Sequence, residues 1–235
     1  LDDDVRWVLT KGKLPADAWE EIVRTAHRLG IRSSSTIMYG HIESSRHKAI
    51  HLDILREIQK RTGGITEFVP LSFVYEEAPM FHRKPPAGLR QGASGAEVMK
   101  MYAVSRLVLN NYIPNLQVSW VKEGPKLSQI ALLAGANDFG GTLINESIST
   151  AAGASYGQLM KPSQFRGLIR EMGRIPAERS TTYQKIRVFE SEDHHRDLLD
   201  DVSDPAQRFG SYQNLIHLRE YRFKDFYREQ KNQNQ

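Results

Sequence analysis

The chain contains no cysteine among its 235 residues. This absence excludes disulfide bonds, a catalytic thiolate and an iron–sulfur cluster held by the chain's own side chains. Long apolar runs are also lacking, since none approaches the roughly 18 residues that a membrane-spanning helix needs. The first residues carry no signal or transit pattern. We therefore expect a soluble protein, not secreted, that resides in the cytoplasm or in the stroma or matrix of an organelle.

Blocks of a single charge are absent as well. The formal net charge is +4, and lysine and arginine alternate with aspartate and glutamate. This pattern is typical of solvated helix faces, so we expect neither a nucleic-acid partner nor a membrane surface. We expect no metal site, because His41 has no second histidine or carboxylate at ligand spacing nearby. His194 and His195 lie in an acidic stretch and are expected to be solvated.

Regular alternation of strand and helix patterns is the main structural signal. Asp2 to Leu9 reads as a helix, so the given sequence is expected to begin inside a larger protein. Apolar spacing predicts further helices over residues 15–30, 46–61, 96–110, 126–133 and 162–173. Residues rich in β-branched and aromatic side chains predict strands over 32–38, 66–74, 116–121 and 136–143. A long irregular segment, residues 78–95, is expected to be functional because compact domains seldom keep such loops otherwise.

This alternation favours an α/β fold with a parallel sheet and helices outside it. A complete (β/α) barrel needs roughly 250 residues and eight strands. We therefore predict a partial (β/α) barrel over residues 1–186, the C-terminal half of a TIM-type barrel. Residues 187–235 are predicted to form a linker and a helical tail, with one amphipathic helix over 211–231 that packs on the barrel or, less favoured, binds a partner.

In such a fold, ligands bind where parallel strands end. Two segments follow predicted strand ends in the first part of the chain. The turn at residues 39–43 carries a glycine beside a histidine and a glutamate, which fits either a ligand site or a tight strand-to-helix turn. At the third strand, Gln117 and Trp120 lie on opposite faces, and Trp120 either stacks on a flat ring or packs against a helix.

The fourth predicted strand ends in a loop rich in glycine and polar groups, residues 135–154. Burying so many polar side chains is costly unless each has a partner. A polyhydroxy or heterocyclic ligand would supply partners, and this interpretation is favoured over a loop that satisfies itself internally. The polar side chains concerned are Asn137, Asp138, Thr142, Glu146 and Ser147. No residue can be assigned a catalytic role from the pattern alone.

Four motifs in order carry a family resemblance: TIMYGHIESSRHKAIHL (36–52), EFVPLSFVYEEAP (67–79), IPNLQVSWVKEGP (113–125) and GANDFGGTLINESISTAAGAS (135–155). Together they resemble the radical S-adenosylmethionine enzymes of deazaflavin and futalosine metabolism, over about residues 1–186. Within this group, GGTLINESIS and EEAP are most similar to the tyrosine-using component of FO synthase.

The resemblance implies a radical S-adenosylmethionine barrel. In this family, an iron–sulfur cluster cleaves S-adenosylmethionine. A hydroxybenzyl fragment of tyrosine is then joined to 5-amino-6-ribitylaminouracil. The matching positions place Tyr39, Gly40, His41 and Glu43 near S-adenosylmethionine. They place Gln117, Trp120, Asn137, Asp138, Thr142, Glu146 and Ser147 at the substrates.

The departure from the family lies at the cluster, for which this chain has no thiolate. The resemblance therefore implies a fragment that is inactive without a cluster-binding N-terminal half, its expected partner. Two alternatives stay open. One is a radical enzyme of the futalosine menaquinone pathway, and the other is a cluster-free ligand-binding protein.

Overall fold

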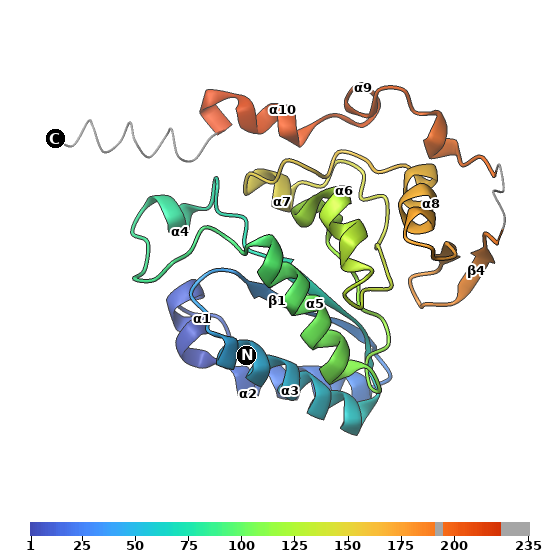
Figure 1. Cartoon of the computed structure of the whole chain (residues 1–235). Helices are drawn as coiled ribbons and strands as arrows, with labels where there is room; N and C mark the ends of the chain where they lie inside the picture. Colours follow the sequence, from blue (N-terminus) through green and yellow to red (C-terminus); the bar gives the residue numbers. More distant parts are fainter. Residues whose placement is uncertain (191–194, 222–235) are drawn as a thin grey trace. The chain divides into compact units, whose positions relative to one another are not determined.

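The computed structural model describes residues 1–190 and 195–221 of the chain (Figure 1). These residues form two compact units. The first combines Leu1–Phe73, Lys84–Val118 and Ala134–Asp138. The second combines Val74–Arg83, Ser119–Leu133 and the chain from Phe139 onward. The chain therefore leaves and re-enters each unit, and the predicted boundary at residue 186 remains a prediction.

The first unit is built on parallel strands. Strand β1 (Ser33–Tyr39) pairs in parallel with β2 (Ile65–Ser72), and helix α3 (Ser45–Thr62) connects them. Two isolated parallel bridges, Phe68↔Leu116 and Gln117↔Asp138, continue the order. Four parallel segments thus follow one another in chain order, as the strand and helix alternation predicts.

The predicted third and fourth strands were too long. Only single bridges form at Leu116, Gln117 and Asp138, because helix α6 already begins at Trp120 and Gly140 turns the chain with φ +75°. The expected mixed α/β class is confirmed. Closure of a barrel is not seen in the part of the chain that the structure describes.

Helices cover one face of these strands. They are α1 (Asp3–Thr10), α2 (Ala16–Arg28), α3 and α5 (Gly95–Leu109), and all four were predicted within a few residues. Local signals set their ends. Ser94 and Glu97 form a reciprocal capping box at the start of α5, and Gly63 ends α3 with φ +63°.

Strand register decides which side chains face the helices. The ring of Phe68 lies 6.4 Å from that of His51 on α3, so Phe68 faces the helix layer. Residues paired across neighbouring strands share a face, and successive residues alternate. Tyr39, Leu116 and Asn137 therefore share the helix face. Gln117 and Asp138 lie on the other face.

The second unit is mostly helical. Its helices are α4 (Pro79–His82), α6 (Trp120–Ala131), α7 (Ile148–Ala151), α8 (Pro162–Glu171), α9 (Pro205–Phe209) and α10 (Tyr212–His217), with short 3-10 turns η1 (Leu198–Asp201) and η2 (Arg219–Tyr221). An antiparallel hairpin joins β3 (Ala177–Arg179) to β4 (Lys185–Val188).

Three details of this unit differ from the sequence predictions. Helix α6 begins six residues earlier than expected and kinks at Gly124, where φ is +76°. The hairpin was not foreseen, because its two strands are too short to show a period. The tail predicted as one helix over 211–231 forms α10 and η2 instead, and its remainder lies outside the described residues. Among residues 1–190 and 195–221, no helix combines the length and apolarity that crossing a bilayer requires.

Candidate functional site

The turn after β1 is closed by its own hydrogen bonds. The Glu43 carboxylate accepts from the backbone N–H groups of Gly40 and His41, both at 2.9 Å. Burial alone would raise the pKa of Glu43, but these two bonds outweigh it and hold the pKa below its usual value. Glu43 is thus an ionised, buried anchor of the turn.

His41 is fixed in one neutral form. Its Nε2 donates to the Met38 carbonyl at 2.9 Å, and its Nδ1 accepts from the Ile42 N–H at 2.7 Å. Burial lowers the pKa of His41, and the nearby Glu43 carboxylate only partly opposes this shift. Both ring nitrogens therefore serve the turn itself.

The predicted functional segment 78–95 is tied to the same turn. Arg90 bridges two carboxylates, with Nη2 2.8 Å from Glu43 and Nη1 2.6 Å from Glu97. Gly40 has φ +86°, and a Cβ there would lie 2.5 Å from the Ala93 backbone nitrogen. The glycine is therefore required by the close approach of the chain's own backbone. Of the four residues predicted near the cofactor, three serve the turn and Tyr39 is buried against the helices.

At the third and fourth parallel segments, the predicted residues separate onto two faces. The bridge brings Gln117 and Asp138 together on the face away from the helices. The Asn137 side chain points the other way. Its Oδ1 accepts from Arg106 and from the Leu116 N–H, and its Nδ2 donates to the Pro114 carbonyl. Its amide thus holds the neighbouring segment in register.

Trp120 lies at the start of α6 and is 2% exposed. Its indole N–H donates to the Gly141 carbonyl at 2.9 Å, and its ring meets Phe165 edge-on at 6.2 Å. Phe139 packs edge-on against the same Phe165 ring at 5.6 Å. This environment favours the packing interpretation of Trp120, which the sequence left open.

Glu146 lies two residues before the start of helix α7. Its carboxylate accepts from the backbone N–H groups of Ile148 and Ser149, at 3.0 and 2.9 Å. The neighbouring residues Thr142 and Ser147 are half-buried. Their hydroxyls make no hydrogen bond in the part of the chain that the structure describes. These two hydroxyls are consequently open to a ligand.

The C-terminal segment is fastened to this loop. The Asn145 side chain accepts from the Tyr212 N–H at 2.9 Å and donates to the Phe209 carbonyl at 3.3 Å. Gln158 donates to the Gly210 carbonyl at 2.9 Å. Asn145 has φ +49°, a left-handed conformation that asparagine tolerates better than most residues. Helices α9 and α10 are thereby held to the loop that the sequence predicts to bind substrate.

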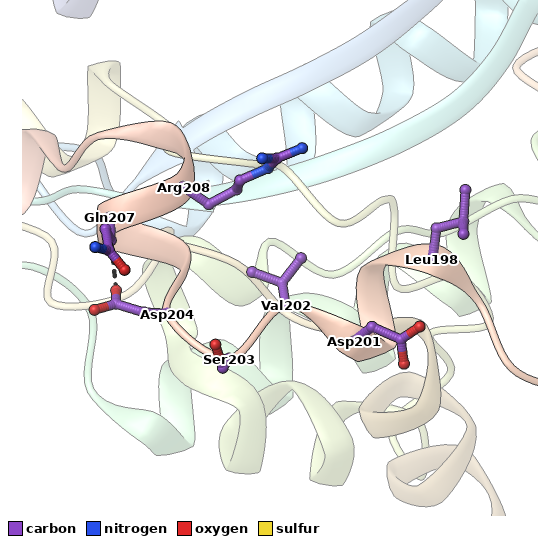
Figure 2. Close-up of a pocket in the computed structure, with 7 residues that line it drawn as sticks. All are labelled: Leu198, Asp201, Val202, Ser203, Asp204, Gln207 and Arg208. Carbon is purple, nitrogen blue, oxygen red and sulfur yellow. Dashed lines mark hydrogen bonds between the residues drawn. The ribbon is translucent and has the colours of Figure 1, made fainter.

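One hollow in the described residues lies elsewhere. It has a volume of about 530 Å³ and belongs to one exposed segment of the C-terminal region (Figure 2). Its walls are Leu198, Asp201, Val202, Ser203, Asp204, Gln207 and Arg208. None of the predicted site residues lines it, and a ligand there would contact a single stretch of chain. We therefore do not assign the substrate site to this hollow.

Two further points concern metal binding and Lys122. Within residues 1–190 and 195–221, no group of three or more histidine, cysteine, aspartate or glutamate side chains could hold a metal ion. The sequence places Lys122 at the end of the third predicted strand but assigns it no site role, and the structure has it half-buried in the first turn of α6. The signal was available, because Lys122 follows Trp120 by two residues. A lone lysine, however, usually reads as a solvated side chain.

Comparison with known proteins defines the class. Residues 62–192 match the family model described as the CofH/MqnC C-terminal region, and the chain belongs to this family. The resemblance to the tyrosine-using component of FO synthase, predicted from the four motifs, is confirmed by the relatives described next.

Three relatives illustrate the sequence identity and the coverage of these matches. The chain is 52% identical over 186 residues to the 5-amino-6-(D-ribitylamino)uracil–L-tyrosine 4-hydroxyphenyl transferase 1 of Methanococcus maripaludis, covering 79% of this chain and 51% of the relative. It is 51% identical to the corresponding transferase of Methanothermobacter thermautotrophicus, covering 79% and 50%. It is 48% identical to the FO synthase of Mycobacterium tuberculosis, covering 78% and 21%. The chain spans about half the length of the curated transferases that it matches.

Proposed function

We propose that this chain is the substrate-binding half of a radical S-adenosylmethionine transferase. The reaction joins a tyrosine-derived hydroxybenzyl group to 5-amino-6-ribitylaminouracil in deazaflavin biosynthesis. The observation that carries this proposal is the 52% identity to a transferase named for these two substrates. The fold supports it, because the described part of the chain offers four parallel segments in order, with no strand paired to the free edge of β1.

That open edge is part of the proposal. An unpaired parallel strand edge promotes association with another strand. We propose that residues 1–186 form half of a TIM-type barrel and that the cluster-binding half completes it. In this arrangement the face carrying Gln117 and Asp138 lines the interior, where a polyhydroxy ligand would find hydrogen-bond partners.

The iron–sulfur cluster does not fit the residues present. Its ligands are thiolates, and the chain has no cysteine. The cluster and the chemistry of S-adenosylmethionine cleavage therefore belong to the other half. For S-adenosylmethionine itself, we propose an indirect role for the turn at 39–43. The polar atoms of Glu43 and His41 already make hydrogen bonds within the turn. These two residues therefore position the turn and do not bind the cofactor directly.

On the substrate side, the proposed role of each side chain depends on whether its polar atoms already make hydrogen bonds within the chain. Thr142 and Ser147 have open hydroxyls that can hydrogen-bond a ribityl chain. Glu146 fixes the loop that presents them. Asn137 and Trp120 hold neighbouring segments in place, as their internal bonds indicate.

The test is a chimera. The N-terminal half of the Methanococcus maripaludis transferase is joined to this chain, the cluster is reconstituted, and formation of the hydroxybenzyl adduct of 5-amino-6-ribitylaminouracil is followed by mass spectrometry. Product formation with tyrosine and 5-amino-6-ribitylaminouracil supports the proposal. A Thr142→Val, Ser147→Ala chimera should raise KM for ribitylaminouracil, whereas the exposed control Thr10→Val should not.

Two alternatives have their own signatures. A chimera that consumes a futalosine-pathway substrate, and not tyrosine, identifies the menaquinone-pathway relative that shares the matched family region. A soluble monomeric chain that binds ribitylaminouracil but is inert in every chimera supports the cluster-free binding protein.

A further inference from the structure

Lys122 is a half-buried cation without a partner. Its backbone N–H bonds to the Ser119 carbonyl, but its ammonium group makes no hydrogen bond or ion pair in the described part of the chain. Lys126, on the next turn of α6, is its natural comparison. The side chain of Lys126 is 78% exposed and lies 3.7 Å from Glu171.

The surroundings of Lys122 make an unpaired ammonium costly. Burial lowers the pKa of Lys122, while the fields of Glu146 and Glu123 oppose this shift. A charge held at such a position without a partner is usually balanced by something that binds.

The start of α6, the turn that carries Lys122, lies beside the loop with the open hydroxyls. A Cβ built on Gly157 would lie 3.0 Å from Cγ1 of Val121 and 3.4 Å from Cβ of Glu146. The same point lies 3.4 Å from Oγ1 of Thr150 on α7. The start of α6, the Glu146 loop and helix α7 therefore converge around Gly157.

Glu146 is near enough for its charge to act on Lys122, but the two side chains form no ion pair among the described residues. Its carboxylate is occupied by the backbone N–H groups at the start of α7. The ammonium group of Lys122 and the hydroxyl of Ser147, the residue after Glu146, are thus both without a partner among the described residues.

We propose that Lys122 binds the carboxylate of the amino-acid substrate, tyrosine, beside the loop that presents Ser147. This inference rests on the proposed function, which supplies tyrosine as a substrate. A charge-assisted hydrogen bond to a carboxylate satisfies the ammonium and distinguishes an amino acid from the corresponding amine. S-adenosylmethionine carries the same type of carboxylate, so the experiment must separate the two sources.

The experiment is a calorimetric titration of the chimera described above, which contains all 235 residues of this chain, with L-tyrosine, tyramine, S-adenosylmethionine and 5-amino-6-ribitylaminouracil. In Lys122→Met, the affinity for tyrosine should fall about 10- to 100-fold, as expected for a hydrogen bond to a charged group. Tyramine, which lacks the carboxylate, should bind wild type and variant equally. Lys122→Arg should restore part of the affinity, and the exposed control Lys126→Met should leave it unchanged.

The melting temperature of Lys122→Met distinguishes a loss of binding from a loss of folding. Because Lys122→Met removes an unpaired half-buried charge, the melting temperature should stay at or above that of the wild type.

The results that would contradict the inference can be distinguished from those that would contradict the proposed function. Unchanged tyrosine affinity in a folded Lys122→Met chimera overturns the inference alone, and so does a loss confined to S-adenosylmethionine. A wild-type chimera that binds ribitylaminouracil but not tyrosine also overturns it and leaves the proposed function standing. Failure to bind either substrate counts against both.

Discussion

The carboxylate of Glu43 lies 2.8 Å from the guanidinium of Arg90, 47 residues further along the chain. The side chain of Glu43 is 3% exposed, whereas that of Arg90 is 37% exposed. Arg90 also binds Glu97 at 2.6 Å, and Lys48 lies 3.6 Å from Glu43. A buried anion at the end of β1 thereby fixes both the segment before α5 and the start of α5 itself.

Replacing Arg90 should destabilise the fold, because the buried carboxylate of Glu43 would lose a cationic partner. We expect Arg90→Met to lower the free energy of unfolding by about 1–3 kcal/mol, because Glu43 keeps its charge and loses its closest cationic partner. Urea denaturation measures this change. The control is Arg28→Met, which breaks an exposed pair with Glu21 and should cost much less, because solvent screens that pair. Equal effects of the two substitutions would contradict the anchoring role of Glu43.

Gly40 should tolerate no side chain. Gly40→Ala would bring its Cβ within 2.5 Å of the Ala93 nitrogen, in a backbone conformation that already disfavours alanine. We expect a loss of about 2 kcal/mol or more and faster hydrogen exchange at the Arg90 N–H, which bonds to the His41 carbonyl. Gly88→Ala is the matched control, since φ there is +78° but nothing lies within 4 Å. A Gly88→Ala chain as unstable as Gly40→Ala would show that φ alone matters.

His41 should make the fold sensitive to mild acid. Because burial lowers its pKa in the folded chain, the unfolded chain binds more protons at and below pH 6.5, the ordinary value. The contribution of His41 is therefore complete above about pH 6.5 and is lost as the pH falls toward its folded pKa. The slope from this one group cannot exceed about 1.4 kcal/mol per pH unit.

Unfolding of wild type and of His41→Asn, compared at pH 7.5 and 5.5, isolates this contribution. The wild type should lose more stability than the variant over this interval. His217→Asn, at an exposed position, should keep the wild-type slope. Parallel pH profiles for wild type and His41→Asn would rule the effect out.

Asn145 should control how firmly the C-terminal segment is held. Asn145→Ala removes the bonds to the Tyr212 N–H and the Phe209 carbonyl. We expect hydrogen exchange at Tyr212 to quicken about 5- to 30-fold, which corresponds to losing about 1–2 kcal/mol of local stability. Asn110→Ala serves as the control, since Asn110 is an exposed residue at the end of α5. An unchanged Tyr212 rate would show that the other bonds, from Gln158 to the Gly210 carbonyl and from Gln213 to the Ser155 carbonyl, suffice to hold the segment.

Local patterns were sufficient for much of the fold. Helices α2, α3, α5 and α8 follow from apolar spacing and end signals that lie within the helices themselves. The parallel order follows from alternation. The two shortened strands could not be foreseen, because a strand ends where its neighbour stops pairing, and the neighbour is distant in sequence.

The sequence by itself determined the family, the mixed α/β class and the absence of cluster ligands. Those properties reside in residue identity and spacing. Only the tertiary structure decided which polar residues already have hydrogen-bond partners within the chain. Glu43 meets Arg90 and Asn137 meets Arg106 across dozens of residues, so no local window reveals that their bonds are already satisfied. For the same reason Lys122 gained importance only when folding left it half-buried and without a partner among the described residues.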